Sequence, residues 1–413
     1  MSAPAASNDG FPRVLAAEVV SNFGTMLSRL AIPWLAAITL QAAPWQMGAL
    51  LLADVAAGAV GALLLGRWVD RWPKRATLVA CDLLNMTVLA LLALAAWQQQ
   101  LGMVMLAAAA AASGLLTMTF ELARSAWMAQ VVAASDLPRR NAQLSVGGSL
   151  SETAAFALGG WLFQGLGAAL ALALDALSYA LSALCLRGVR EVAPAQPQAA
   201  QLDGAGVPMP QRWLGELKIG LEQVRQSPVL LRLAALELLL GLAAALFSIS
   251  YLIHLSRELQ ISTGVQGLVI AMGGLGSVLG GLLAVRAGAR WGSSTALALG
   301  LLLTAIGMAC VPAAQGQGWW ALGLLVAHQV VGDGGMTVAQ VHDRTLRQTL
   351  VAPQYLAQVD GALRAVGQLA MAFAAIAGGV LATAWGTRPA LWLAAALGAL
   401  AVVVAVDAAR YKR

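Results

Sequence analysis

The sequence carries little charge. Lys, Arg, Asp and Glu make up 11% of its 413 residues, whereas 60% of the residues are apolar. Soluble domains contain about 25% charged residues, so this composition excludes a soluble globular protein. With a rise of about 1.5 Å per residue, roughly twenty residues of helix cross a hydrocarbon core of about 30 Å. We therefore expect an all-α protein that crosses the lipid bilayer about a dozen times.

Cysteine and histidine are also scarce, with three of each. The cysteines stand on three different apolar stretches without Cys-x-x-Cys spacing, which argues against a disulfide framework or a structural zinc site. His328 and His342 have no companion at metal-ligand spacing. The sequence lacks a phosphate-binding loop ending in Lys-Ser/Thr, a His-Glu-x-x-His motif and a Gly-x-Ser-x-Gly motif. We expect no metal, no cofactor and no enzymatic activity, with an ion gradient as the energy source.

The basic residues indicate orientation. Apolar stretches predict spans at residues 13–40, 44–66, 76–97, 101–130, 140–165, 168–187, 228–253, 264–285, 293–313, 318–345, 355–383 and 386–407. With the N-terminus inside, nearly all Lys and Arg fall on cytoplasmic segments, and only the outside loops with Arg257 and Arg388 carry a basic residue. The net charge of +6 therefore reflects topology. We expect both termini in the cytoplasm and no nucleic-acid partner.

The segment 188–227 differs from the rest of the chain. Its first part is rich in Ala, Pro, Gln and Gly and cannot bury an apolar face. In its second part, apolar side chains recur at helical spacing opposite charged residues, at Leu214, Leu217, Leu221 and Val224. We expect a six-helix half at 1–187, a cytoplasmic linker at 188–227 with an amphipathic helix on the inner membrane surface, and a second six-helix half at 228–413.

A short basic segment, Gly66 to Arg75, separates the second and third spans. Gly66 permits two helix ends to approach closely, and Asp70 and Arg71 can pair or cap neighbouring helix ends. Lys74 and Arg75 favour a cytoplasmic position. We predict a tight turn here. An ordinary cytoplasmic loop whose charges only set topology is the alternative.

The pattern Gly-x-x-x-Asp-Arg-x-x-Lys-Arg in this segment resembles the loop between helices two and three of the major facilitator superfamily of secondary transporters. A weaker copy, Gly281 to Arg290, lies between spans eight and nine, with Val285 in place of Asp70. The resemblance implies twelve transmembrane helices in two pseudo-symmetric six-helix halves, with a substrate cavity near the bilayer midplane.

Further segments resemble the proton-linked drug exporter branch of this family, which includes macrolide and enterobactin exporters. These segments are Val20–Gly24, Arg124–Ala126, Leu137–Ala142, Leu158–Gly160, Leu174–Tyr179, Arg347–Gln348 with Pro353, and Val359–Arg364. The sequence departs from the branch at Ala155-Phe156, where a Gly-Pro is usual, and at Ala372, where a proline is usual. The resemblance implies a monomer in the bacterial cytoplasmic (inner) membrane that moves a small-molecule substrate and protons.

Polar residues form a stripe on span one. Glu18, Asn22, Thr25 and Arg29 follow at steps of four, three and four, which places them on one helix face. Ionisable groups in spans usually face a cavity or a partner. We predict a cavity wall lined by Asn22 and Thr25, where Glu18 takes or releases a proton and Arg29 acts as a counter-charge. A structural pair that joins span one to a neighbouring helix is the alternative.

Asp54 lies about ten residues into span two. A carboxyl group at this depth is costly to keep charged. This cost favours uptake of a proton, which a proton-coupling group requires. We predict that Asp54 couples proton or substrate movement. An ion pair with Arg29 is the alternative.

Span ten carries the second-half counterpart of the stripe. Polar residues share one face at Gln329, Asp333, Thr337, Gln340, Arg344 and Arg347. We predict that Asp333, among three glycines, is a third coupling residue and that Gln329 and Thr337 line the cavity.

Charged residues near the inner ends of spans suggest a gate. Asp360 and Arg364 are four apart on span eleven and are expected to pair across one helical turn. We predict that this pair closes the cytoplasmic side together with Gly66, Asp70, Arg71 and Arg75. Glu121 and Arg124 are expected to form a local pair on span four. Glu237 is expected to be a lone carboxylate with a hydrogen-bonded packing role, and a coupling site is the alternative.

We expect a secondary active transporter that exports a lipophilic or amphipathic small molecule, such as a drug, siderophore or metabolite, by proton-coupled alternating access. An importer or lipid transporter of the same fold is the alternative, because fold does not determine substrate or direction. A non-transporting receptor or scaffold fits less well, since it has little reason to keep carboxylates in several spans.

Overall fold

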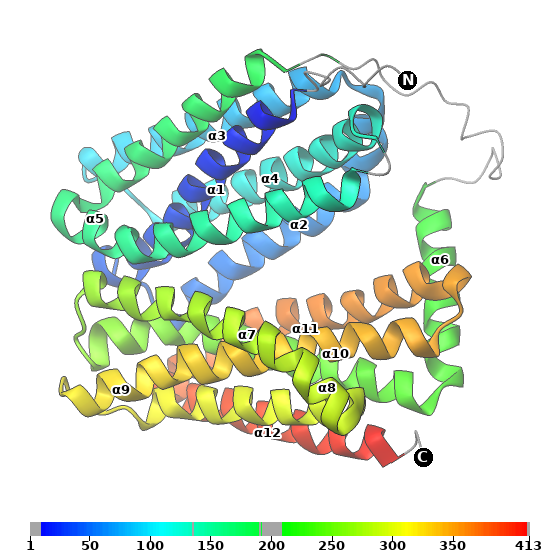
Figure 1. Ribbon diagram of the computed structural model, residues 1–413. Coiled ribbons are helices and arrows are strands. Elements are labelled where there is room, and N and C mark those ends of the chain that lie inside the picture. The colour runs from blue at the N-terminus through cyan, green and yellow to red at the C-terminus, as the bar shows by residue number, and fades with distance from the viewer. Residues whose placement is uncertain (1–9, 134–135, 190, 192–208, 411–413) are drawn as a thin grey trace. The chain divides into compact units, whose positions relative to one another are not determined.

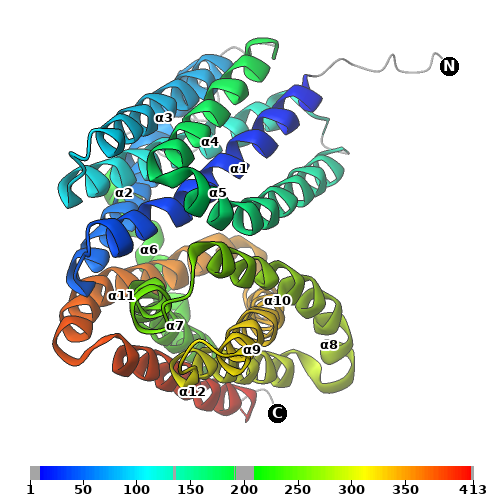
Figure 2. The same ribbon diagram turned by 90° about the vertical axis from the view of Figure 1, so that its left-hand side faces the viewer.

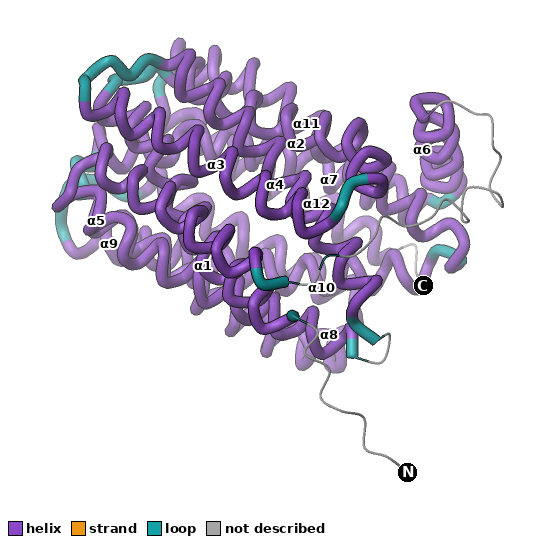
Figure 3. The backbone as a smooth tube through the Cα atoms, turned by 90° about the horizontal axis from the view of Figure 1, so that it is seen from above, coloured by secondary structure: helices purple, strands orange, loops and turns teal. Residues whose placement is uncertain are grey.

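The computed structural model describes residues 10–133, 136–189, 191 and 209–410. The described residues form helices and the segments that connect them (Figure 3). Most of the first part of the predicted linker, residues 192–208, lies outside the described residues.

In the first half, the described residues form five helices and one π-helical turn, drawn from blue to green in Figure 1. They are α1 (Phe11–Trp34), η1 (Leu35–Thr39), α2 (Pro44–Arg71), α3 (Lys74–Trp97), α4 (Met103–Val131) and α5 (Leu137–Arg187). Gly167 has φ 79° and ψ 170°, a conformation that favours glycine, and it breaks α5 into the two helices predicted as spans five and six.

The second half follows α6 (Met209–Gln226). Its elements are α7 (Pro228–Ile253), η3 (His254–Glu258), α8 (Thr263–Ala313), α9 (Trp319–Ala327), η4 (His328–Gly332), α10 (Asp333–Leu350), η5 (Pro353–Tyr355), α11 (Leu356–Trp385) and α12 (Thr387–Arg410). Gly292, with φ 77°, divides α8 as Gly167 divides α5. Together α9, η4 and α10 make up the predicted span ten.

Seven of the described helices are long and apolar enough to cross a membrane, judged by length and composition. Two of them, α5 and α8, have 51 residues each. At about 1.5 Å per residue, each is more than twice as long as a hydrocarbon core of about 30 Å is thick, so each accounts for two spans. These seven helices thus supply nine spans, and α1, α2 and the segment α9–η4–α10 occupy the other three predicted spans. The twelve-span, all-helical fold is confirmed.

The two halves repeat with a constant offset in residue number. The π-helical turns η1 and η3 begin at Leu35 and His254, and 254 − 35 = 219. We call this difference the repeat offset. Gln41 and Gln260, the left-handed residues after these turns, keep it. Gly167 in α5 and Gly386, which separates α11 from α12, keep it as well. The internal repeat is therefore a property of the backbone.

The repeat offset corrects the sequence alignment of the basic segments. Pro73, which precedes α3, and Gly292, the break in α8, are related by this offset. Arg71 and Trp72 therefore correspond to Arg290 and Trp291, and Gly66 does not correspond to Gly281. The prediction aligned the glycines rather than the helix ends, and it was wrong for that reason.

The predicted turn is shorter than expected. The helix α2 continues through Gly66 to Arg71, and only Trp72 and Pro73 separate it from α3. The fully buried Lys74 explains the extension, because its Nζ donates to the carbonyl oxygens of Val69 at 2.6 Å and Trp72 at 3.1 Å. A cation here satisfies the end of α2 and its dipole.

Two compact units make up the structure. In the first, α1 and α3 pack against α5, and in the second, α7 packs against α11 and α12 (Figure 2). The predicted amphipathic helix is present as α6, and other helices of the second unit cover part of it. It packs against α11 at Gly220, and Val224 joins the buried core of the second unit.

Candidate functional site

The middle of the polar stripe of α1 contacts α5. Asn22 Nδ2 donates to the carbonyl oxygen of Gly148 at 3.0 Å, and Thr25 Oγ1 lies 2.8 Å from the hydroxyl of Tyr179. Both contacts tie α1 to α5. Arg29, the last residue of the stripe, is exposed. The shared helix face was predicted from the sequence, but these hydrogen bonds to α5 were not.

Glu18 forms an ion pair with Arg124. Glu18 Oε1 lies 3.1 Å from an Arg124 guanidinium nitrogen, and each side chain is 19% exposed. The predicted local pair of Glu121 and Arg124 is wrong, because Arg124 joins α4 to α1 instead. Glu18 Oε2 and Arg124 Nε have no hydrogen-bond partner among the described residues. This pair therefore has capacity for a further proton or polar group.

A buried carboxyl group also joins α1 to α5. Asp175 is fully buried and accepts hydrogen bonds from Ser28 and Ser178, the latter at 3.2 Å. Gly24 makes room for it, because a Cβ added there would overlap Asp175 and Ser178. Asp175 thus holds α1 close to α5.

The second half has a larger charge cluster around Arg347. One of its guanidinium nitrogens lies 2.5 Å from Glu237 and 2.6 Å from Asp343, and another lies 3.4 Å from Asp360. The cluster joins α7, α10 and α11. The Arg347 side chain is only 7% exposed. Three carboxylates therefore share one buried cation.

This cluster changes two predictions. Glu237 is not a lone carboxylate, and Asp360 pairs with Arg347 rather than Arg364. Arg364 is exposed and forms no ion pair within the part of the chain described here. The importance of Asp343 was not predicted, although its spacing of four from Arg347 was a usable signal.

The repeat offset relates the two ion pairs. Glu237 of α7 is the counterpart of Glu18 of α1, since 237 − 18 = 219. Each glutamate pairs with an arginine on the fourth span of its own half, Arg124 or Arg347. The second half adds two aspartates to the shared arrangement.

The predicted gate residues of the first half are only partly described. The surroundings of Gly66 and the side chain of Asp70 lie outside what the structure describes. Arg71 is exposed, and the backbone N–H of Arg75 donates to Glu191 Oε1 at 3.1 Å. The gate role of this segment stays a prediction.

Asp54 lies on α2 beside α4. A Cβ added to Gly114 of α4 would come within 2.9 Å of Asp54 Oδ1, so the carboxyl group lies against this glycine. Arg29 acts on Asp54 electrostatically. The two residues form no ion pair among the described side chains, so the alternative of a salt bridge between them is not realised.

Asp333 lies at the junction of η4 and α10, beside α8. A Cβ added to Gly273 of α8 would overlap its carboxylate and come within 2.9 Å of Gln329 Oε1. Gln329 Nε2 donates to the hydroxyl of Tyr251 at 3.2 Å. The predicted cavity residue Thr337 is half-buried, and its hydroxyl donates to the carbonyl oxygen of Asp333 at 3.0 Å. π-Helical turns such as η4 are frequent at functional sites.

Aromatic rings lie next to this group. The Phe247 ring stacks on Tyr251 at 5.0 Å between centroids and lies 4.8 Å from the His328 ring. His328 Nδ1 has no hydrogen-bond partner within the described part of the chain. The aromatic and polar side chains together offer both apolar contact and hydrogen bonds to a ligand.

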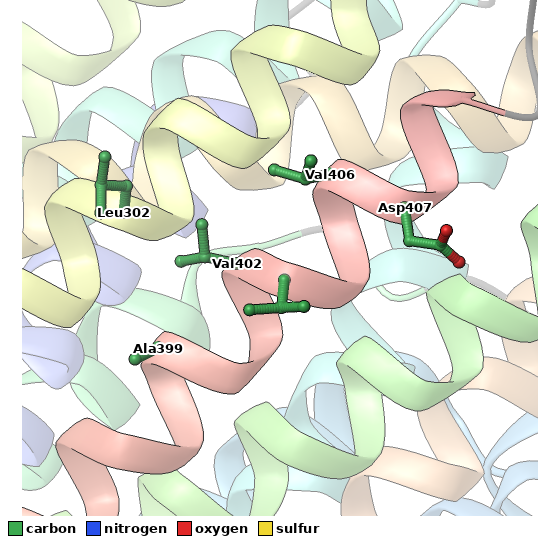
Figure 4. Close-up of a pocket in the computed structure, with 6 residues that line it drawn as sticks. Leu302, Ala399, Val402, Val406 and Asp407 are labelled. Atoms are coloured by element: carbon green, nitrogen blue, oxygen red, sulfur yellow. The ribbon is translucent and has the colours of Figure 1, made fainter.

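An apolar groove of about 430 Å³ lies along α12 and α8 (Figure 4). Its lining is formed by Leu302, Ala399, Val402, Val403, Val406 and Asp407. Asp407 is its charged group and forms an ion pair of 2.6 Å with Arg232. None of the predicted coupling residues lines this groove. In the described residues, no group of three or more His, Cys, Asp and Glu side chains is placed to hold a metal ion.

Comparisons with known proteins agree with this architecture. The sequence matches the model of the family described as Major Facilitator Superfamily over residues 14–253 and again over residues 233–411. The fold is similar to that of the nucleoside transporter NupG, with a TM-score of 0.73, 14% identity and coverage of 98% of both chains. No curated protein sequence matches the chain.

Two further structures are similar in fold. A bacterial homologue of the iron transporter ferroportin, in its inward-facing state, gives a TM-score of 0.76 at 15% identity, covering 98% of this chain and 99% of that chain. A bacterial homologue of the human lysosomal transporter Spinster gives 0.71 at 15% identity, covering 99% and 98%.

Proposed function

The chain belongs to the major facilitator superfamily, and on that premise we propose that it exports lipophilic or amphipathic small molecules in exchange for protons. Membership makes it a secondary transporter and not an enzyme: a multi-pass membrane protein that binds small-molecule substrates within the membrane. The similar structures belong to transporters with different cargoes, so the fold leaves the substrate open. Direction, coupling ion and substrate class are the proposal.

The setting of the proposal follows from the family resemblance and the charge distribution. The protein works as a monomer by alternating access, in the cytoplasmic membrane of a bacterium, with both termini in the cytoplasm. Its two halves are residues 1–187 and 228–413, joined by the linker 188–227.

The carboxyl group of Asp54 is the observation that carries the proposal. It lies ten residues after the start of α2 at Pro44, about 15 Å along the helix and hence near the middle of a hydrocarbon core. The Asp54 side chain is exposed but lies against Gly114 on one side, and its charge is offset by Arg29 without direct pairing. Keeping this carboxylate charged is costly, and taking up a proton removes that cost.

Two other carboxyl groups complete the set. Glu18 holds Arg124 through one oxygen and has a second oxygen available, so protonation would weaken the link between α1 and α4. Asp333 lies beside the aromatic group of the second half, where a ligand would contact it directly. Arg29 serves as the counter-charge of the first half.

In this proposal the cytoplasmic side is closed by the segment with Gly66, Asp70, Arg71 and Arg75. Asp360 contributes through its contact with Arg347. Arg364 remains a candidate because it is exposed and available to a partner.

The test is the accumulation of a panel of lipophilic dyes and antibiotics in pump-deficient cells, with and without a protonophore. Cells express the wild type, Asp54→Asn or the control Asp136→Asn, whose carboxyl group is exposed in a connecting segment and makes no capping hydrogen bond. Membrane levels of each protein are measured by immunoblot. We expect lower accumulation with the wild type and with Asp136→Asn, abolished by Asp54→Asn and by the protonophore.

Other outcomes point to the other functions. Higher accumulation with the wild type than with empty vector would indicate an importer. No effect on any compound, with the protein present in the membrane, would favour a transporter of one narrow substrate or of lipid. Binding of a compound without any flux driven by a gradient would indicate a receptor or scaffold.

A further inference from the structure

Each half holds one aspartate against a glycine of a neighbouring helix. In the first half the pair is Asp54 of α2 and Gly114 of α4, and in the second it is Asp333 of α10 and Gly273 of α8. A Cβ at either glycine would come within 3.0 Å of a carboxylate oxygen, a distance that real Cβ atoms essentially never show. Both carboxyl groups therefore occupy space that only glycine leaves open.

The internal repeat relates the two contacts, with the partners exchanged. The repeat offset places Gly273 at the position equivalent to Asp54, and it places Asp333 at the position equivalent to Gly114. In the first half the second span carries the aspartate and the fourth span carries the glycine. In the second half these residue types are reversed. The place of the carboxyl group between two helices is thus the same, although the helix that carries it differs.

We propose that Asp54 and Asp333 perform the same proton-binding role, one in each half, and that Gly114 and Gly273 are the residues that position them. This inference rests on the proposed function, because it takes both aspartates as coupling groups. The position of the carboxyl group between the two helices matters, and the helix that carries it does not.

Depth in the membrane supports this equivalence. Asp54 and Gly273 each lie ten residues after the first residue of their helices, Pro44 and Thr263. Ten residues of helix measure about 15 Å, half the thickness of the hydrocarbon core. A carboxyl group is most costly at that depth, which favours a functional role for both aspartates.

Each of the two groups has polar neighbours. Arg29 offsets the charge of Asp54, and Gln329 and Tyr251 lie near Asp333. A glycine opposite each carboxyl group lets the helix backbones approach and still leaves the side chain room to turn when its charge changes.

The first experiment exchanges the partners. The double variant Asp54→Gly/Gly114→Asp is compared with the single variant Asp54→Gly and with Asp54→Gly/Gly114→Asn. The readout is ethidium export that is sensitive to a protonophore, at equal membrane levels. We expect both comparison variants to fall to the empty-vector level and the double aspartate variant to recover export. Asparagine fills the same space without taking up a proton, so a packing role would be rescued by it equally well.

A second measurement does not depend on the substrate. Dicyclohexylcarbodiimide modifies protonated carboxyl groups in apolar surroundings, and peptide mass spectrometry locates the label in the purified protein. We expect label at Asp54 and Asp333 in the wild type. In the exchange variant the label should move from the peptide of position 54 to the peptide of position 114. Absence of label at Asp54 or Asp333 would overturn the inference.

Single alanines test the glycines if the exchange variant does not fold. We expect Gly114→Ala to reduce the label at Asp54 and Gly273→Ala to reduce it at Asp333, each in a protein that gives a normal gel-filtration peak. The matched controls are Gly58→Ala on α2 and Gly281→Ala on α8, where an added Cβ meets nothing within 4 Å. Unchanged label in both test variants would refute the positioning role.

The outcomes separate this inference from the proposed function. If Asp54→Asn exports as the wild type does, proton coupling through Asp54 fails and the inference falls with it. If Asp54→Asn abolishes export and the folded exchange variant does not restore it, the exchange inference alone fails.

Discussion

Removing the Arg347 guanidinium should destabilise the second half strongly. In the variant Arg347→Gln, three carboxylates lose the cation that they share. Glu237 and Asp343 are 29% and 21% exposed and lie 2.5 and 2.6 Å from Arg347. Asp360 is 40% exposed and 3.4 Å away, so water already screens most of its interaction.

The expected loss in the free energy of unfolding is about 3 kcal/mol. Breaking a buried pair by removing one partner costs about 3–5 kcal/mol, and protonation of one carboxyl group offsets part of that cost here. The deficit should shrink as the pH falls, because protonation removes the unpaired negative charges of the variant. The same protonation weakens the cluster of the wild type, so the two stabilities converge at low pH.

The assay is chemical unfolding of the purified protein in a mild detergent, followed by tryptophan fluorescence at several pH values. The control is Arg364→Gln, which removes an exposed arginine of the same half and should change stability by less than about 0.5 kcal/mol. The double variant Arg347→Gln/Glu237→Gln should recover part of the loss, since it removes one of the unpaired charges. Equal stability of Arg347→Gln and Arg364→Gln would refute the account of the cluster.

Three further predictions use the same unfolding assay. Gly300→Ala should lower stability by about 1–3 kcal/mol, because its Cβ would lie 2.7 Å from backbone atoms of α10, whereas Gly281→Ala, with open space, should be tolerated. Trp127→Ala should cost about 3–5 kcal/mol, because this side chain is fully buried, and a smaller loss would mean that the site collapses around the gap. Gly386→Ala should cost about 1–3 kcal/mol, because φ 95° and ψ 163° suit only glycine, while Gly361→Ala in the open first part of α11 should cost nothing.

The fold could be predicted from the sequence because hydropathy is a local property. Each span is recognisable from its own residues, and the break at Gly167 was expected between spans five and six. Helix periodicity also placed Glu18 and Arg29 on one face of α1 correctly. What periodicity does not contain is the identity of the helix that this face meets. Arg124 was therefore assigned to Glu121, its neighbour in sequence, instead of Glu18.

The same limit explains the errors in the second half. Asp360 was paired with Arg364 because both lie on one helix, whereas the structure brings Arg347 from another helix. The exchange of Asp54 and Gly114 for Gly273 and Asp333 was hidden for a related reason. It depends on the offset between the halves, and few identical residues reveal that offset in the sequence. The positive φ angles of Gln41 and Gln260 reveal it directly.

Proton movement driven by substrate is the most direct test of the central claim. Purified protein is reconstituted into liposomes that contain a pH-sensitive dye, and a compound exported in the accumulation assay is added outside. An antiporter that carries the compound inward must carry protons outward, so the lumen should become alkaline with the wild type and remain unchanged with Asp54→Asn. Uptake of the compound without any change in lumen pH, or an equal change with Asp54→Asn, would contradict proton-coupled transport through Asp54.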